Sequence, residues 1–259
     1  MTFKKRRILL LVKTYPNLSR KYERTVCMAG IDIDTFDWMR IYPVPYFDLP
    51  YSKRPHKFEV IEVLAERNLA EKFQRKESYK IKSDSIKRLG VIPTEKTWEK
   101  RNEIIYQNIA PSIEFLENQY NVDKTSLGFI KPKKITDFYV TPIEEARDFE
   151  KDLVEGKQKT LFGEDYKTPL DKIPYRFGYK FTCADDCEGH DLMVEDWELL
   201  ALYRELIQRG DSKEVAIEKC IKKYKDDFLS KKDVGFFVGT ESTWNKWLII
   251  GVYYPPKII

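Results

Sequence analysis

The apolar run RILLLV at residues 7–12 is the first of four β-type segments that decide the fold. The other three lie at residues 25–31, 38–42 and 57–66, and Pro43 and Pro45 end the third. These segments are rich in β-branched and aromatic residues. Short strands joined by turn-rich loops are typical of a small barrel or a curled sheet. We therefore expect a β-rich, barrel-like module over residues 1–95, in which the polar and basic stretch 67–97 forms loops.

The middle of the chain shows helical patterning. Residues 97–120 are predicted to be helical with a break at Pro111, after which Ser112 is a typical N-cap for a second short helix. This predicts a helical connector over residues 96–130. Residues 131–174 contain one predicted strand, 135–140, and a long irregular stretch that has the character of a functional loop.

The last 85 residues carry clearer signals. Residues 175–182 predict a strand whose aromatic residues alternate, and a buried sheet face explains this alternation better than a stacking platform does. Asp196 is placed to cap a helix that ends at Arg209 before Gly210. Asp211 and Glu214 fit a capping box for a helix that ends near Leu229.

Two closing strands, 234–238 and 247–254, complete the pattern. The sequence thus predicts an α+β protein. Its N-terminal module is a small β-barrel-like unit, and a C-terminal mixed sheet with two or more helices occupies residues 131–259.

Composition narrows the class of protein. The 259 residues include 46 Lys+Arg and 42 Asp+Glu, a formal charge of +4, with a mean hydropathy of −0.54. No apolar run approaches the ~18 residues of a membrane span, so no membrane partner is expected. Four cysteines in a chain of this length do not form a disulfide framework, which predicts a reducing, cytoplasmic location. Dinucleotide, P-loop and serine-hydrolase motifs are missing, which argues against those enzyme classes.

The charges are unevenly distributed along the chain. Residues 1–57 hold twelve basic and five acidic side chains, a net charge of +7. Residues 181–200 hold seven acidic and no basic side chains. The first segment favours a polyanion such as nucleic acid, whereas the second favours a cation.

The strongest chemical motif in the sequence is Cys183, Cys187 and His190, in C-x3-C-x2-H spacing. Thiolate and imidazole are preferred zinc ligands, so this loop predicts a Zn²⁺ site. A closed site needs a fourth ligand, and the candidates from the sequence are Asp185, Asp186, Asp191, Cys27, Cys220 and His56. The alternative is a hydrogen-bonded loop with two unliganded thiols.

Asp196 and Glu198 follow directly and are the candidate catalytic residues. An open zinc site with a nearby carboxylate is the arrangement that activates a water molecule and supplies its base. The alternative is that Asp196 is an N-cap and that Glu198 lies in the first turn of a helix, where the helix dipole favours acids.

A basic loop joins the first two predicted strands and interleaves cations with aromatic residues. Phosphate contacts require Lys or Arg, and unpaired bases stack on aromatic rings. The candidate nucleic-acid-binding residues of this loop are Lys13, Tyr15, Arg20, Lys21, Tyr22 and Arg24. An ordinary solvated loop is the alternative.

Two further motifs carry a resemblance. Residues 26–30 (VCMAG) and 38–43 (WMRIYP) resemble the opening of small-barrel proteins of the OB or PUA-like kind. Together with CEGH at 187–190 and DWE at 196–198, they resemble a group of uncharacterised prokaryotic proteins. The barrel resemblance implies oligonucleotide or nucleobase recognition on the barrel face, with Arg40 and Tyr42 near the bound strand.

Two functions follow from these patterns. The first is nucleic-acid binding, to DNA or RNA, through the basic N-terminal face, with a structural metal loop. The second is a metal-dependent hydrolase or nuclease that acts on nucleic acid or nucleotides. A subunit that binds another protein and has no site of its own is the third interpretation.

Overall fold

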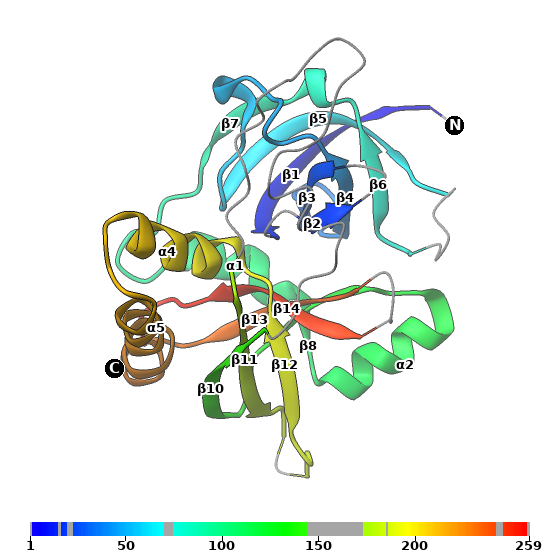
Figure 1. Ribbon diagram of the computed structural model, residues 1–259. Helices are drawn as coiled ribbons and strands as arrows, with labels where there is room; N and C mark the ends of the chain where they lie inside the picture. Colours follow the sequence, from blue (N-terminus) through cyan, green and yellow to red (C-terminus); the bar gives the residue numbers. More distant parts are fainter. Residues whose placement is uncertain are drawn as a thin grey trace.

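The computed structural model describes residues 2–14, 17–19, 23–69, 75–143, 173–184, 186–241 and 246–257. The chain forms two β-modules that pack against each other (Figure 1). The N-terminal module is a closed five-stranded barrel, which confirms the predicted barrel-like module and adds a fifth strand to the four predicted ones. Its strands, in the order in which they pair around the barrel, are β1 (Lys4–Lys13), β3 (Glu23–Asp32), β4 (Trp38–Val44), β6 (Ser78–Ile81) and β5 (Glu59–Arg67).

Pairing between β5 and β1 closes the barrel. All of its neighbouring strands are antiparallel except β4 and β6, which are parallel. Two further strands extend the sheet: β2 (Asn17–Ser19) pairs with β3, and β7 (Lys87–Val91) pairs with β5. Short 3₁₀ turns at Tyr51–Lys53 and Ser83–Ser85 connect the strands.

Strand β1 is buried on both of its faces, which explains its uninterrupted apolar run. Ile8 and Leu10 point into the barrel, where they pack with residues such as Met28 and Ile41. Leu9, Leu11 and Val12 belong to a separate core with side chains of the second module. A strand covered on both sides does not alternate between polar and apolar residues, so β1 joins the two modules.

The second module is a seven-stranded mixed sheet. Its strands, in spatial order, are β10 (Lys134–Pro142), β11 (Tyr175–Thr182), β12 (His190–Val194), β14 (Trp247–Tyr253), β13 (Gly235–Thr240), β9 (Leu127–Ile130) and β8 (Ile109–Ala110). The β12–β14 and β8–β9 pairs are parallel, and the other pairs are antiparallel. The alternating aromatic residues of β11 are buried, with Phe177, Tyr179 and Phe181 at most 1% exposed, so the predicted buried sheet face is confirmed.

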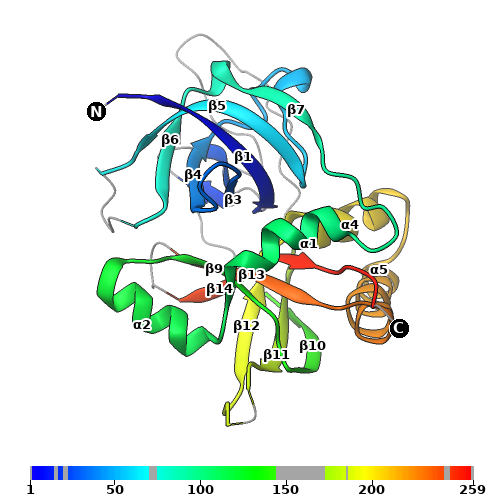
Figure 2. The same ribbon diagram turned by 180° about the vertical axis from the view of Figure 1, so that it is seen from behind.

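Helices surround this sheet. They are α1 (Glu99–Ile105), α2 (Ile113–Asp123), α4 (Trp197–Gln208), α5 (Lys213–Ile221) and α6 (Phe228–Lys231), with a 3₁₀ turn at Tyr106–Asn108 and a π-helical segment at Lys222–Asp227. Seen from behind, α2 lies at one side of the module and α4 and α5 lie at the other (Figure 2). Among the described residues, no helix is both long and apolar enough to cross a membrane.

The predicted helix caps are confirmed at two of three positions. The Ser112 hydroxyl accepts a hydrogen bond from the Phe115 amide, and the Asp196 carboxylate accepts one from the Glu198 amide. Helix α4 ends before Gly210, whose φ of 97° lies in the left-handed region. The capping box at Asp211 is wrong, because Ser212 is the N-cap of α5.

The prediction that residues 67–97 form loops is also wrong, because β6 and β7 lie there. Strand β6 is short and polar, but Ser78 is fully buried where β6 inserts between β4 and β5. Its pairing partners, rather than its own composition, make it a strand. The segment 96–130, predicted as a helical connector, holds α1 and α2 but also β8 and β9, which are strands of the second sheet.

Candidate functional site

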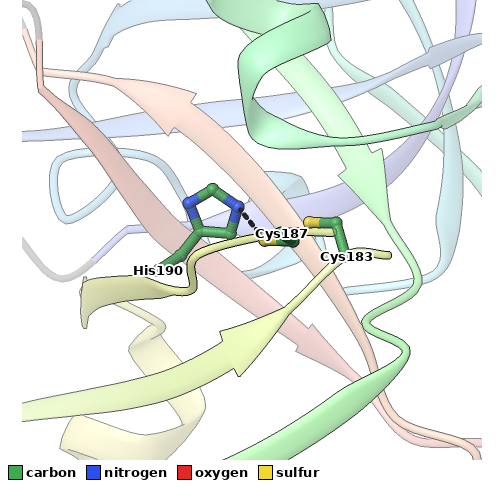
Figure 3. Close-up of side chains that lie close together, drawn as sticks. All are labelled: Cys183, Cys187 and His190. Carbon is green, nitrogen blue, oxygen red and sulfur yellow. Dashed lines mark hydrogen bonds between the residues drawn. The ribbon is translucent and has the colours of Figure 1, made fainter. Parts of the chain in front are cut away.

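The hairpin between β11 and β12 brings the Cys/His motif together (Figure 3). Cys183 follows the end of β11, and His190 is the first residue of β12. Gly189, with a φ of 106°, reverses the chain between them. The ligand atoms of Cys183, Cys187 and His190 all lie within 4.8 Å of one another, and Cys187 Sγ is 3.2 Å from His190 Nε2. This cluster could hold a metal ion.

The fourth ligands predicted from the sequence do not join the cluster in the described part of the chain. Asp185 lies outside the described residues. Of the others, Asp191 accepts a hydrogen bond from Tyr139, Cys220 is buried in α5, and His56 is 3.3 Å from Arg88. A different acid is close: Glu114 Oε1, in the first turn of α2, is 3.3 Å from His190 Nε2. The sequence signal for Glu114 is only its position after the Ser112 cap.

A second site is a cavity of about 470 Å³ between the barrel and α4. The barrel contributes the end of β1 and the residues before β5, and the second module contributes the start of α4. The lining residues are Lys13, His56, Lys57, Asp196, Trp197, Glu198, Ala201, Leu202, Glu205, Lys223 and Tyr254. Cavities of this size between modules commonly bind small ligands.

Lys57 forms the floor of this cavity and links the two modules. Its ammonium lies 3.0 Å from Glu198 Oε2 and 3.5 Å from Asp196 Oδ2, and it donates to the Val252 carbonyl at 3.1 Å. The side chain is only 6% exposed. Burial alone would lower the pKa of Lys57, but the two carboxylates outweigh burial and raise it. The two carboxylates therefore favour the protonated form of Lys57.

Asp196 and Glu198 have different surroundings in this cavity. The carboxylate of Asp196 is buried and accepts from the Glu198 amide at 2.9 Å, the Val252 amide at 2.7 Å and Lys57. Its role is thus to hold α4, β14 and the barrel together. Glu198 is 38% exposed; burial favours its protonated form, but Lys57 outweighs burial and lowers its pKa. Of the two catalytic candidates, Glu198 is the one that faces the cavity as an ionised carboxylate.

Lys13 lies at the mouth of the cavity, where the predicted basic loop begins. Its ammonium donates to the Tyr46 hydroxyl at 3.3 Å and is 4.9 Å from the ring centroids of both Tyr46 and Trp197. Burial lowers the pKa of Lys13 to about 8, and the ammonium of Lys57 acts in the same direction. Trp197 also packs against Phe47, which docks the start of α4 on the barrel.

The other predicted nucleic-acid-binding residues are placed differently. Tyr15, Arg20, Lys21 and Tyr22 lie outside the described residues, and of Arg24 only the backbone, in β3, is described. Tyr42 is half-buried in β4. Arg40 is 4% exposed, and its guanidinium donates to the Ser126 carbonyl at 2.8 Å, so it joins the barrel to the second module.

The cations at the start of β1 are largely neutralised by neighbouring acids. Lys5 pairs with Glu62, Arg6 with Asp32, and Arg7 with Asp34. The N-terminal segment, despite its positive net charge, therefore does not present a uniform basic face. Within the described residues, Lys13 differs from these three because it forms no ion pair and borders a cavity.

The Cys/His cluster and the two carboxylates do not form one metal centre. His190 is the first residue of β12, whereas Asp196 follows the last residue of that strand. Strand β12 spans about 16 Å at ~3.3 Å per residue, so the two groups lie beyond opposite ends of it. The predicted arrangement of a zinc-bound water beside Asp196 or Glu198 is not present. Sequence reasoning missed Lys57, Tyr46 and Tyr254, because their only signal is their proximity in the folded chain.

Two family matches together cover nearly the whole chain. Residues 4–107 match the Domain of unknown function (DUF8758), and residues 108–258 match the Domain of unknown function (DUF8757). No curated protein matches the sequence. A solved structure described as murine DNA binding protein bound with ds DNA aligns over 99% of this chain and 97% of its own, with 12% identity. Its TM-score is 0.30, too low to support an argument about fold or function. The match to DUF8757 covers residues 108–258, which is more than half of this chain, so the protein belongs to the DUF8757 family.

Proposed function

We propose that this protein binds nucleic acid, DNA or RNA, where the basic loop that begins at Lys13 meets the cavity between the barrel and α4. The observation that carries this proposal is the position of Lys13. Its cation borders a cavity of about 470 Å³, lies 4.9 Å from the ring centroids of the half-buried Trp197 and the buried Tyr46, and forms no ion pair with any described acid. Proteins that bind single-stranded nucleic acids combine cations, which contact the phosphates, with aromatic side chains, on which the bases stack.

The sequence that follows Lys13 supports the same proposal. Arg20, Lys21 and Arg24 occur within eleven residues of it, interleaved with Tyr15 and Tyr22. Cations so close in sequence reinforce one another at a polyanion, because each phosphate contact releases condensed counterions.

Titration of fluorescent oligonucleotides, single- and double-stranded, tests this function. The affinity should fall linearly with salt on a log–log scale, and Lys13→Met should lower that slope by about 0.7–0.9 through loss of one phosphate contact. Reversal of Arg20 and Lys21 to Glu should weaken binding for every sequence. Lys134→Met, at an exposed position of strand β10, is the matched control. Undetectable binding at low salt, or equal slopes for Lys13→Met and Lys134→Met, would contradict the proposal.

A second candidate function is hydrolysis of nucleic acid or a nucleotide in the same cavity. The observation that favours it is Glu198, an ionised carboxylate with one oxygen bound to Lys57 and with 38% of its side chain exposed. A carboxylate so placed can accept a proton from water. Cleavage lost in Glu198→Gln but retained in Glu205→Gln, also on the cavity lining, would establish the enzyme. Intact oligonucleotides after prolonged incubation, with and without divalent metal, would leave binding as the function.

We further propose that the metal ion of the Cys/His cluster is zinc and that its role is structural. The donor set of two thiolates and an imidazole suits Zn²⁺. The cluster lies at the far end of β12 from the carboxylates of the cavity, which supports a role in holding the hairpin. Metal analysis of protein purified without chelator should find about one zinc per chain, and less than a tenth of an equivalent would exclude it. A protein partner and a cytoplasmic location stay predictions.

A further inference from the structure

The first turn of helix α2 lies against the Cys/His hairpin, although the two are about 70 residues apart in the sequence. We infer that the carboxylate of Glu114 is the fourth ligand of the metal ion bound by Cys183, Cys187 and His190. This inference rests on the zinc binding proposed above. It makes the site a closed Cys₂HisGlu centre that fastens α2 to the β11–β12 hairpin.

The distances around His190 are close to those expected for ligands that share one ion. Zinc bonds of ~2.0–2.3 Å at the tetrahedral angle place ligand atoms about 3.3–3.8 Å apart. His190 Nε2 is 3.3 Å from Glu114 Oε1 and 3.2 Å from Cys187 Sγ. Cys183 Sγ completes the three-residue cluster within 4.8 Å. Glu114 is not part of that three-residue cluster, so its carboxylate has to move toward the two thiols to complete a tetrahedron.

The backbone fixes Glu114 at this position. The Ser112 cap starts α2 two residues earlier, and Ile113, 3% exposed, anchors the helix start in the core of the second module. The start of α2 is therefore held beside the cluster by the packing of Ile113.

Charge compensation is consistent with a carboxylate ligand. Two thiolates and one carboxylate around Zn²⁺ leave a net charge of −1 on the site. The N-terminus of α2, where Glu114 lies in the first turn, carries a partial positive charge that offsets it. Four protein ligands also leave no open position for water, which is the pattern of a structural zinc site.

The competing explanation is that Glu114 forms only an ion pair with protonated His190. Its side chain is 54% exposed, so as an ion pair it would stabilise the metal-free fold by at most about 1 kcal/mol, which Glu114→Ala would lose. The two explanations differ in metal affinity. Loss of a ligand should weaken zinc binding by at least the ~10–100-fold that loss of a partner hydrogen-bonded to a ligand costs.

The experiment uses the full chain with zinc and with cobalt(II), whose absorption reports thiolate and tetrahedral coordination. Zinc affinity is measured by chelator competition for wild type, Glu114→Ala, Glu114→His and the control Glu117→Ala, an exposed acid of the same helix. We expect Glu114→Ala to bind zinc at least tenfold more weakly than wild type and to show altered cobalt d–d bands. Glu114→His should restore the zinc affinity, and Glu117→Ala should behave like wild type. Melting temperatures in excess chelator should be equal for wild type and Glu114→Ala.

The outcomes separate this inference from the proposal on which it rests. Wild-type protein that binds no metal would overturn both. One tightly bound zinc in the wild type, with the same affinity and cobalt spectrum in Glu114→Ala, would overturn the Glu114 ligand alone. A lower melting temperature of Glu114→Ala in excess chelator, with unchanged metal affinity, would establish the ion pair instead.

Discussion

The ammonium of Lys57, just before β5 of the barrel, lies 3.0 Å from the carboxylate of Glu198 in the first turn of α4. The two residues are 141 positions apart in the sequence, and each belongs to a different module. Asp196 joins the same cluster, and Lys13 borders the same cavity. The junction between the modules is therefore both a structural contact and the candidate ligand site.

The buried cation of Lys57 should be essential to stability. Lys57→Met removes the partner of two carboxylates, one of which is buried, and we expect the free energy of unfolding to fall by about 3–5 kcal/mol. Lys100→Met removes an exposed ion pair with Glu95 and should change the free energy of unfolding by less than about 1 kcal/mol. Urea denaturation of both variants measures the difference. Similar midpoints for the two would show that the Lys57 cluster contributes no more than a surface pair.

Asp196 should not tolerate asparagine, although asparagine caps helices as well as aspartate does. In Asp196→Asn, an amide group replaces one carboxylate oxygen, so it cannot accept from both the Glu198 and Val252 amides and also neutralise Lys57. We expect a loss of about 2–4 kcal/mol in unfolding free energy. Ser212→Asn, at the N-cap of α5, is the control and should stay within about 0.5 kcal/mol of wild type. An unchanged free energy of unfolding in Asp196→Asn would show that Asp196 acts only as a helix cap.

The affinity for nucleic acid should depend on pH through Lys13. Its pKa of about 8 means that the ammonium, which attracts phosphate, is lost as the pH rises from about 7 to about 9. Binding should weaken over this range at fixed salt. Lys13→Arg stays protonated, so its affinity should be flat across the same range. Parallel pH profiles for wild type and Lys13→Arg would assign the titration to another group.

Removal of a thiolate from the Cys/His cluster should remove the metal. Cys187→Ser is expected to lose zinc and to melt at a lower temperature than wild type, because metal binding adds directly to the free energy of folding. Cys27→Ser, a half-buried thiol in β3 outside the cluster, should keep its zinc. Metal analysis and thermal unfolding of both proteins check the prediction. Full zinc content in Cys187→Ser would remove Cys187 from the ligand set.

Much of the second module follows from local sequence signals. The aromatic alternation of residues 175–182 predicts β11, and Ser112 and Asp196 predict the starts of α2 and α4. A strand period or a cap depends only on residues within a few positions of one another, so such signals can be recognised without the fold. The Cys/His motif is of the same kind, since one hairpin holds its three members.

What the sequence by itself determined, then, is the set of strongly patterned elements, the α+β class and the three-residue cluster. The tertiary structure alone decided that the polar β6 inserts between β4 and β5, that Arg40 is buried against Ser126, and that Lys57 meets Glu198. It also decided that Glu114 lies beside His190. These pairings join residues dozens to more than a hundred positions apart, and no local period or cap encodes them. The Arg40–Ser126 and Lys57–Glu198 contacts form where the two modules pack together along the double-sided strand β1, and the other two pairings form as each module folds.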